Sequence, residues 1–595
     1  MTTTPLPVMH KPAGEPSEAH LGVAAMADLT FDVHAYVDDF NQAVVGAYRR
    51  NVADRELPAD PAVARSVIPP GTAAGRDFSR LAPTIPVIRA DACVGCMACV
   101  SACPDSAIFG IAVPESDLAS RLDELAADGS GSGAGAGAAA HFTRTQKYAE
   151  LPSRRGLEPA AFGIFVDPLH CKGCSECVTV CHELGHDALV MVAKGSIAGS
   201  AADPSDAAVP ETKADDRDPR ASVGPAVSVL GPAVSVLDPA VSVLDAAVRD
   251  FAFFRTLPAT PLPYRNEKAL VDLMLGEHAF GYVGGAGSCS GCGEATAIRM
   301  MVAATRQVYG PEGMAIVAAT GCNTVFGSTY PFNPYLVPWT NSLFENAPAV
   351  AAGVRGRWDA AGHPERRIWV MGGDGAMFDI GFQALSRLVA SGADVKVLVL
   401  DGQVYSNTGG QASTASFGGQ VTKLSAYGKE LHGRTERRKE LGRILVAHGE
   451  AYVAQTTAAH TNHFYRAILE ANEFPGPAVV IAYSPCQPEH GIADDASTRQ
   501  ARLAVESRAF PLFTYDPRRG ESLAERLSLQ GNPALRDDWS RRPDGTPLDF
   551  LDFARTEGRF AAHFGADGAP TAEIEATRED RLANWHWLQE LAGLR

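Results

Sequence analysis

Two neighbouring stretches decide the fold: RIWVMGGDGAMFDIG at residues 367–381 and VKVLVLDGQVYSNTGG at residues 395–410. Each contains an apolar run with the length of a strand and ends in glycines and polar residues. Similar apolar runs occupy residues 314–320 and 477–483, and a helical pattern covers residues 379–391. Continuous apolar strands that alternate with helices are typical of a parallel sheet covered on both faces. The sequence therefore predicts an α/β fold.

The two strand ends carry the residues that a diphosphate site requires. A glycine turn after a strand lets a diphosphate approach the backbone and the N-terminus of the next helix. Asp374 in the first turn supplies a carboxylate oxygen, the ligand type that Mg²⁺ prefers. A single acidic glycine turn is common and weakly specific, but two turns at the ends of consecutive strands form one crevice. We therefore predict a site for thiamine diphosphate and Mg²⁺.

Eight of the twelve cysteines lie in two runs of equal spacing, CVGCMACVSACP at residues 93–104 and CKGCSECVTVCH at residues 171–182. This spacing is typical of ferredoxins with two [4Fe–4S] clusters, in which the fourth cysteine of each run binds the other cluster. Zinc knuckles, the structural alternative, have two close pairs of cysteines rather than two triplets. His182 stands where proline is usual, which affects the rigidity of the loop more than ligation. The predicted ligands are Cys93, Cys96, Cys99 and Cys181 for cluster A, and Cys171, Cys174, Cys177 and Cys103 for cluster B.

The composition limits the classes of partner and compartment. The 595 residues include 46% hydrophobic and 20% charged residues, and the formal net charge is −17. These values are ordinary for a globular protein, and without a basic tract they argue against nucleic acid as a partner. No apolar run reaches the roughly 18 residues of a membrane helix, and no secretory signal is visible, so we expect a cytoplasmic protein without a membrane partner. In that reducing compartment, cysteines are expected to bind metal or act in catalysis rather than form disulfides.

Changes in composition along the chain predict five segments. A Gly/Ser/Ala-rich insertion occupies residues 128–140, and PAVSVL occurs three times with a period of seven between residues 225 and 244. Because every repeat contains proline, a continuous coiled coil is excluded and a linker is expected. The expected segments are an N-terminal tail and connector (1–90), a small α+β ferredoxin-like domain (91–192), a low-complexity linker (193–264), the α/β thiamine-binding domain (265–490) and a C-terminal tail packed on it (491–595).

Further motifs follow one another in a fixed order along the chain. They are PPGTAAGRDFSRLAPTIPV (69–87), GSCSGCGEA (287–295), ATGCNTVFGSTYPFNPY (319–335), NSLFENA (341–347) and YSPCQPEHGI (483–492). Together with the two cysteine runs and the two strand-end turns, they resemble the C-terminal half of pyruvate:ferredoxin oxidoreductase, in the 2-oxoacid oxidoreductase family. The resemblance covers about residues 65–520, apart from the two insertions.

The resemblance implies roles for individual residues. Asp374 and the carbonyl oxygen of Val404 would bind Mg²⁺, and Glu294 and Asn407 would be catalytic. Considered alone, Glu294 is also compatible with a solvated helix start, and Asn407 with a turn former. The remaining cysteines would hold a third [4Fe–4S] cluster beside thiamine, although either Cys322 or Cys486 alone is also compatible with an inert buried thiol. The implied ligands of this third cluster are Cys289, Cys292, Cys322 and Cys486. The implied cofactor-binding residues are Glu294, Cys322, Gly373, Asp374, Gly375, Ala376, Gly402, Gln403, Val404, Tyr405, Ser406 and Asn407.

One position departs from the family pattern. Pyruvate enzymes of this family read D-T-x-V-Y-S-N, with a threonine hydroxyl on Mg²⁺, where this chain has Gly402. Glycine offers no side-chain ligand, so either a water molecule completes the coordination of Mg²⁺ or the site is weakened. We expect the water, because the other elements of the crevice are present.

The resemblance implies the β subunit of a 2-oxoacid:ferredoxin oxidoreductase. It would convert pyruvate, CoA and oxidised ferredoxin into acetyl-CoA, CO₂ and reduced ferredoxin, with ferredoxin or flavodoxin as the electron acceptor. No segment is long and regular enough for a pyrimidine-binding domain, so we expect an α subunit that carries this domain and the CoA-handling domain, in a hetero-oligomer such as a dimer of αβ units. The alternatives are the same chemistry on 2-oxoglutarate or another 2-oxoacid, an electron-transfer subunit with a decayed thiamine site, and a zinc-binding structural module.

Overall fold

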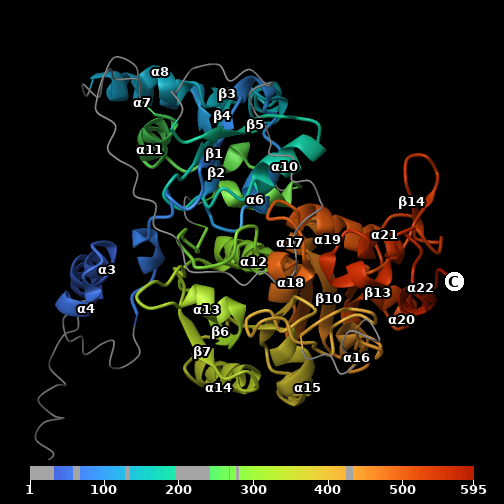
Figure 1. The fold of residues 1–595 in the computed structure, drawn as a ribbon. Coiled ribbons are helices and arrows are strands. Elements are labelled where there is room, and N and C mark those ends of the chain that lie inside the picture. Colours follow the sequence, from blue (N-terminus) through green and yellow to red (C-terminus); the bar gives the residue numbers. More distant parts are fainter. Residues whose placement is uncertain are drawn as a thin grey trace, which may run out of the picture. The chain divides into compact units, whose positions relative to one another are not determined.

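An eight-stranded sheet forms the centre of the larger part of the chain (Figure 1). The computed structural model describes residues 33–57, 68–127, 134–195, 242–266, 268–276, 280–423 and 433–595. The strands of the sheet are β6 (Met314–Ala319), β7 (Trp339–Ser342), β8 (Arg367–Gly373), β9 (Lys396–Asp401), β10 (Tyr452–Thr457), β11 (Ala478–Tyr483), β12 (Phe513–Tyr515) and β13 (Leu527–Ser528). Their order is β13-β12-β10-β11-β9-β8-β6-β7, and every pair is parallel except those that involve β12. The predicted α/β fold with a parallel sheet is confirmed.

Both faces of the sheet are buried, which explains why the strands are apolar without interruption. Successive side chains of a strand point to opposite faces. In β8, Ile368 and Val370 belong to one hydrophobic core, whereas Trp369 and Met371 belong to the other. The first core is shared with helices α14 (Ala347–Ala360), α15 (Phe382–Ala390) and α16 (Leu441–Val446), and the second with α12 (Gly293–Tyr309) and α17 (Thr461–Glu473).

The two cysteine runs lie in a small α+β part with twofold-repeated loops. Each run continues into a short helix, and in each run the residues at two equivalent positions have left-handed backbone conformations. These are Gly95 and Met97 in the first run, with φ of 72° and 65°, and Gly173 and Ser175 in the second, with φ of 67° and 68°. The equal spacing of the runs is therefore matched by equal backbone geometry. The elements of this part are β1 (Thr84–Ile88), α6 (Ala98–Ala102), β2 (Ile108–Pro114), β3 (Phe142–Thr143), β4 (Ala160–Val166), α10 (Glu176–Glu183) and β5 (Leu189–Ala193), with β1 paired to β5 and a sheet of order β2-β4-β3.

The ferredoxin-like part and one face of the central sheet share a single hydrophobic core. A buried lysine also connects them: Lys172 Nζ donates to Asp105 Oδ1 at 2.6 Å and to the carbonyl oxygen of Ser288 at 2.7 Å. Lys172 follows Cys171, and Ser288 precedes Cys289. The loop of the second cysteine run is therefore bonded directly to the loop of the third set of cysteines.

Three segments differ from the sequence-based expectation. Within the expected irregular insertion, Ala134–Ala139 form helix α8, in keeping with the high helix propensity of alanine. Within the expected linker, Val243–Phe254 form helix α11, because its apolar face is buried and the Phe254 ring packs on that of Phe109 at 5.3 Å. Beyond residue 490, β12 and β13 extend the central sheet. Residues 128–133 and 196–241, which include most of the PAVSVL repeats, lie outside the described residues.

The chain divides into two compact units, Met1–Pro69 and Pro70–Arg595, and the second contains the sheet. In the N-terminal unit, helix α2 (Val33–Phe40), a π-helical turn (Asn41–Val45) and helix α3 (Gly46–Arg49) follow one another directly. Phe40, Val44 and Ala47 are buried among them. This helical stretch lies within the expected tail and connector.

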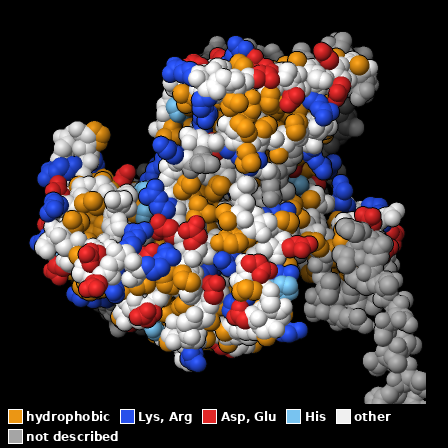
Figure 2. Space-filling view, turned by 180° about the vertical axis from the view of Figure 1, so that it is seen from behind, with side chains coloured by type: hydrophobic (Ala, Val, Ile, Leu, Met, Phe, Trp, Pro, Cys, Tyr) orange, Lys and Arg blue, Asp and Glu red, His pale blue; other side chains and the backbone are white. Residues whose placement is uncertain are grey.

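The surface carries charges of both signs. On the face seen in Figure 2, lysine and arginine side chains lie among aspartate and glutamate side chains rather than in a separate field. On this face, charges of opposite sign are therefore interspersed. Among the residues that the structure describes, no helix combines the length and the apolar character needed to cross a membrane.

Candidate functional site

In the structure, the fourth cysteine of each run lies with the first three cysteines of the other run. One small cavity is lined by three cysteines of the second run together with Cys103 of the first. A second cavity is lined by three cysteines of the first run together with Cys181 of the second. The two sets of four are Cys171, Cys174, Cys177 and Cys103, and Cys93, Cys96, Cys99 and Cys181. This is the grouping that the sequence predicts for clusters B and A.

The surroundings of these thiols fit iron–sulfur clusters. The backbone N–H of Ala107 donates to Cys103 Sγ at 3.4 Å, and that of Ala188 donates to Cys181 Sγ at 3.3 Å. Such bonds to sulfur are a means by which proteins tune these clusters. Within the described part of the chain, no group of three His, Cys, Asp or Glu side chains is arranged to hold a single metal ion. Each set of four cysteines lines a small cavity, as the ligands of an iron–sulfur cube would.

The third set of cysteines comes together from three distant parts of the chain. Cys292 precedes α12, Cys322 begins helix α13 (Cys322–Gly327), and Cys486 precedes helix α18 (Gln487–His490). Burial raises the pKa of the Cys322 thiol, and the nearby charges of Glu294, Cys292, Cys486 and Cys289 raise it further. The structure therefore brings Cys322 and Cys486 to one place, although they are far apart in sequence.

The loop that carries Cys289 and Cys292 depends on Gly291. This residue has a φ of +71°, and a Cβ built on it would lie 1.9 Å from the carbonyl oxygen of Asp494. We expect Gly291→Ala to lower the free energy of unfolding by roughly 1–3 kcal/mol through backbone strain, and to displace the loop so that the third cluster is lost. Thermal unfolding and iron analysis measure the two effects. Gly392→Ala is the matched control, because Gly392 has a φ of +72° but no heavy atom within 4 Å of the added Cβ. Equal iron loss in both variants would contradict the prediction.

A crevice opens at the carboxyl ends of β6, β8 and β9, beside the third set of cysteines. Its cavity has a volume of about 260 Å³. The predicted residues that line it are Glu294, Cys322, Gly373, Asp374, Gly375, Ala376, Val404, Tyr405, Ser406 and Asn407. Residues that line it without having been predicted are Thr320, Gly321, Phe344, Ile380 and Thr408. Two predicted residues, Gly402 and Gln403, are not part of the lining.

Gln403 is directed away from the crevice for a structural reason. It is fully buried and has a left-handed backbone with a φ of 58°. Its side-chain Oε1 accepts a hydrogen bond from Arg559 Nη2 at 2.7 Å, and its carbonyl oxygen accepts one from Ser416 Oγ at 2.6 Å. The hydrogen bonds of Gln403 therefore hold the turn on the side away from the crevice. Val404 and the residues that follow it line the crevice.

Two carboxyl groups in the crevice each have one oxygen without a hydrogen-bond partner. Glu294 Oε2 and Asp374 Oδ2 are buried, and neither has a partner in the described residues. Burial raises the pKa of Glu294 to about 7. Burial also raises the pKa of Asp374 well above its usual range, and the nearby charge of Asp401 adds to this. Buried carboxylates are stable only with a cation or a proton. The site at Asp374 therefore fits a divalent cation with a diphosphate.

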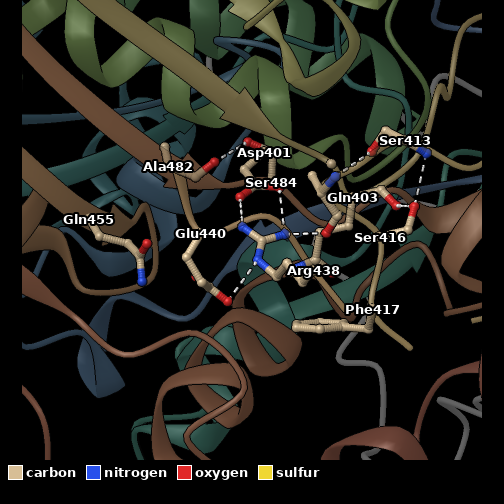
Figure 3. A network of polar contacts seen from close by, with 12 residues as sticks. Asp401, Gln403, Ser413, Ser416, Phe417, Arg438, Glu440, Gln455, Ala482 and Ser484 are labelled. Carbon is tan, nitrogen blue, oxygen red and sulfur yellow. Dashed lines mark hydrogen bonds and ion pairs between the residues drawn. The ribbon is translucent and has the colours of Figure 1, made fainter. Parts of the chain in front are cut away.

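A network of buried charged side chains packs against the turn that follows β9 (Figure 3). The guanidinium of Arg438 forms an ion pair with Asp401, the last residue of β9, and donates to the carbonyl oxygen of Ala415. Burial lowers the pKa of Arg438, but the charges of Asp401 and Glu440 raise it by more, so the side chain stays cationic. Sequence reasoning missed Arg438, because nothing in its local pattern connects it with a strand end 37 residues earlier.

His490 connects the crevice to the third set of cysteines. Its Nε2 lies 2.8 Å from the carbonyl oxygen of Gly402, and the backbone N–H of Cys486 donates to its Nδ1 at 3.4 Å. The side chain is fully buried and stacks on the ring of Tyr483. The motif YSPCQPEHGI contains this histidine, but only the folded chain shows that it reaches the turn after β9.

Comparison with known families agrees with this arrangement. The family described as "Thiamine pyrophosphate enzyme, C-terminal TPP binding domain" matches residues 319–482. The family described as "4Fe-4S binding domain" matches residues 86–109. The first match covers the strand ends that form the crevice, and the second covers the first cysteine run. The fold and the site thus define a thiamine-type α/β domain joined to a ferredoxin-type domain.

Individual relatives identify the family. The chain is 33% identical to pyruvate synthase subunit PorB of Methanothermobacter thermautotrophicus over 41% of this chain and 85% of that subunit. It is 28% identical to the probable pyruvate-flavodoxin oxidoreductase of Escherichia coli K12 and to the pyruvate:ferredoxin oxidoreductase of Moorella thermoacetica, over 87% and 83% of this chain. The chain belongs to the pyruvate:ferredoxin oxidoreductase family. It spans 42% and 41% of the lengths of the last two relatives.

Proposed function

We propose that this chain is the thiamine-binding and electron-transferring β part of a 2-oxoacid:ferredoxin oxidoreductase with pyruvate as its substrate. The reaction converts pyruvate, CoA and oxidised ferredoxin into acetyl-CoA, CO₂ and reduced ferredoxin. One observation carries the proposal: Cys322 lines the crevice and also belongs to the third set of cysteines. A group oxidised in the crevice would thus lie directly beside the first electron acceptor.

The residues of the crevice have distinct tasks in this proposal. Thiamine diphosphate, when bound, supplies a carbanion for attack on the keto carbon and an electron sink for decarboxylation. Asp374 and the carbonyl oxygen of Val404 hold Mg²⁺, and the glycine turn at Gly373 and Gly375 accepts the diphosphate. With a pKa of about 7, the Glu294 carboxyl holds or releases a proton near neutral pH at its unpartnered oxygen. Asn407 lines the crevice and orients the substrate.

The three sets of cysteines hold three [4Fe–4S] clusters that lead electrons away from the crevice. The third set lies at the crevice, and Lys172 bonds its loop to the loop of cluster B. Clusters A and B follow in the ferredoxin-like part. Cys96 of cluster A is exposed, which suits delivery of electrons to ferredoxin or flavodoxin.

The crevice requires a partner that completes it. Apolar side chains are exposed around its mouth: Ile380 is 60% and Leu343 is 59% exposed, and Phe344 and Ile380 line the cavity. Exposed apolar patches of this kind mark interaction sites. We propose that the pyrimidine-binding and CoA-handling domains cover this surface, either as an α subunit in a hetero-oligomer such as a dimer of αβ units or as a further part of a longer polypeptide.

Gly402 offers a direct test of the Mg²⁺ site. A Cβ added there would lie 3.5 Å from Ser406 Oγ and 3.9 Å from Glu294 Oε1, which are ordinary contacts. We therefore expect Gly402→Thr to fold normally and to supply a hydroxyl ligand in place of water. The Mg²⁺ concentration for half-maximal thiamine diphosphate binding should fall several-fold, as measured by titration of bound thiamine. Gly402→Val is the control with similar volume and no hydroxyl. Equal effects of the two variants would show that the hydroxyl is not a ligand.

The proposed function is tested by anaerobic purification of the complex with its native partner. We expect about twelve iron atoms per chain, four for each cluster, together with thiamine diphosphate and Mg²⁺. Addition of pyruvate and CoA should reduce ferredoxin. A complex with full iron but without thiamine would overturn the catalytic proposal and favour an electron-transfer subunit. Faster turnover of 2-oxoglutarate than of pyruvate would change the substrate and keep the chemistry.

A further inference from the structure

Arg299 is a fully buried cation at the contact between α12 and the ferredoxin-like part. Its Nη2 donates to the carbonyl oxygens of Val100 and Ser101 at 2.6 and 2.7 Å. These carbonyls belong to the end of α6, which is followed directly by Cys103, a ligand in the cluster B set. Arg299 Nε and Nη1 have no hydrogen-bond partner.

No carboxylate neutralises this guanidinium in the described part of the chain. Asp105 is the one carboxylate among its electrostatic neighbours, after the Cys103 thiol and the Tyr465 phenol. Asp105 already forms an ion pair with Lys172 at 2.6 Å. Burial of a charge without a counter-charge is strongly unfavourable. A negative group on the side of Cys103 would therefore stabilise Arg299.

Arg508 is a second buried arginine and serves as a comparison for Arg299. Arg508 is equally buried, donates from Nη2 to two backbone carbonyls at 2.7 and 2.9 Å, and also leaves Nε and Nη1 without partners. Its guanidinium, however, stacks 4.0 Å above the Trp585 ring, whereas that of Arg299 lies farther from an aromatic ring, 5.8 Å from the centre of Phe280. Unpartnered nitrogens alone are thus not specific. The distinguishing feature of Arg299 is its position, because the two carbonyl oxygens that it contacts belong to α6, directly before Cys103.

We propose that Arg299 is the counter-charge of cluster B and raises its reduction potential, so that the electron leaving the third cluster moves to cluster B. This inference rests on the proposed function, because it requires a cluster on Cys103. A [4Fe–4S] cube with four thiolates carries a formal −2 when oxidised and −3 after it accepts one electron, and no proton is transferred. Arg299 stabilises the second state more than the first, since attraction grows with charge. The electron comes from the reduced third cluster, which returns to its oxidised state.

The expected size of the effect follows from electrostatics. A unit charge within about 10 Å, at an effective dielectric constant of about 20, changes a one-electron equilibrium constant by about tenfold or more. Removal of the charge should therefore lower the midpoint potential of cluster B by about 59 mV or more, since this is a tenfold change for one electron. The potentials of cluster A and the third cluster should change less.

The test is an EPR-monitored redox titration of the intact complex with Arg299→Gln, Arg299→Lys and the control Arg508→Gln. The signal of cluster B is identified by its loss in Cys103→Ser. We expect Arg299→Gln to lower the cluster B potential, Arg299→Lys to keep it near the wild-type value, and Arg508→Gln to leave it unchanged. Loss of cluster B in Arg299→Gln but not in Arg299→Lys would also support a charge role.

Other outcomes overturn the inference. Unchanged potentials in Arg299→Gln with full iron would show that the charge is not felt by cluster B. Equal shifts in the glutamine and lysine variants, or loss of cluster B in both, would assign Arg299 to packing of α6 alone. Absence of cluster B from the wild-type complex would instead refute the proposed function, and iron analysis before the titration separates the two failures.

Discussion

Cys103→Ser will remove the cluster of the second cysteine run, and Cys181→Ser will remove the cluster of the first. The reason is the exchange of the fourth cysteines: Cys103 lines a cavity with Cys171, Cys174 and Cys177, which lie far from it in sequence. Each variant should lower the iron content from about twelve to about eight atoms per chain. Iron analysis and EPR of the reduced protein measure the loss.

Double variants make this prediction specific. Cys103→Ser combined with Cys174→Ser should lose no more iron than either change alone, because both residues bind one cluster. Cys103→Ser combined with Cys96→Ser should lose about twice as much, because Cys96 lines the other cavity. The reverse pattern would assign each run to a cluster of its own and would refute the exchange.

Asp374→Asn will abolish Mg²⁺-dependent binding of thiamine diphosphate while leaving the clusters intact. Asp374 is 4% exposed, and its unpartnered oxygen lines the crevice, so the carboxylate charge is available for the cation. An amide removes that charge. Changes to groups that merely support a metal ligand already cost roughly 10–100-fold in affinity, so loss of a ligand should cost at least about 100-fold. Bound thiamine and pyruvate turnover, each measured against the Mg²⁺ concentration, test this.

Asp379 provides a matched control for the Asp374 variant. It lies in the same turn region, but its carboxylate is already satisfied by the Tyr405 hydroxyl at 2.6 Å and by Thr414. We expect Asp379→Asn to lower the stability of the turn and to retain Mg²⁺-dependent binding. If Asp379→Asn were the more harmful change at equal iron content, the assignment of Asp374 as the metal ligand would be wrong.

The local sequence pattern was sufficient to predict strands made of uninterrupted apolar residues and motifs with a repeated spacing. The apolar runs predicted β6, β8, β9 and β11, and the repeated cysteine spacing predicted how the eight cysteines group around two cavities. Strand β10 was missed, because Gln455, Thr456 and Thr457 are polar and yet buried. Helix α11 was missed because its sequence continues the PAVSVL repeats, and only its packing on Phe109 shows that the linker ends there.

Some residues of the site could likewise be predicted from the local sequence, and others could not. Asp374 and Val404 follow strands that the sequence makes visible, and the structure places both in the crevice. The pairing of Cys322 with Cys486 rested on family resemblance alone until the fold brought them together. Arg438 and His490 act through contacts with backbone atoms and ions that are distant in sequence. Such contacts depend on tertiary structure, which leaves no local signal.

The shared hydrophobic core has a consequence for how electrons can move. The ferredoxin-like part is packed against the face of the sheet that α12 and α17 cover, and the two share one hydrophobic core. Electron transfer between buried centres slows steeply as their separation grows. In the proposed relay, this shared packing would keep the distances between the clusters fixed. Control of the proposed reaction would then lie at the two ends of the relay, where substrate would enter the crevice and where a carrier protein would dock.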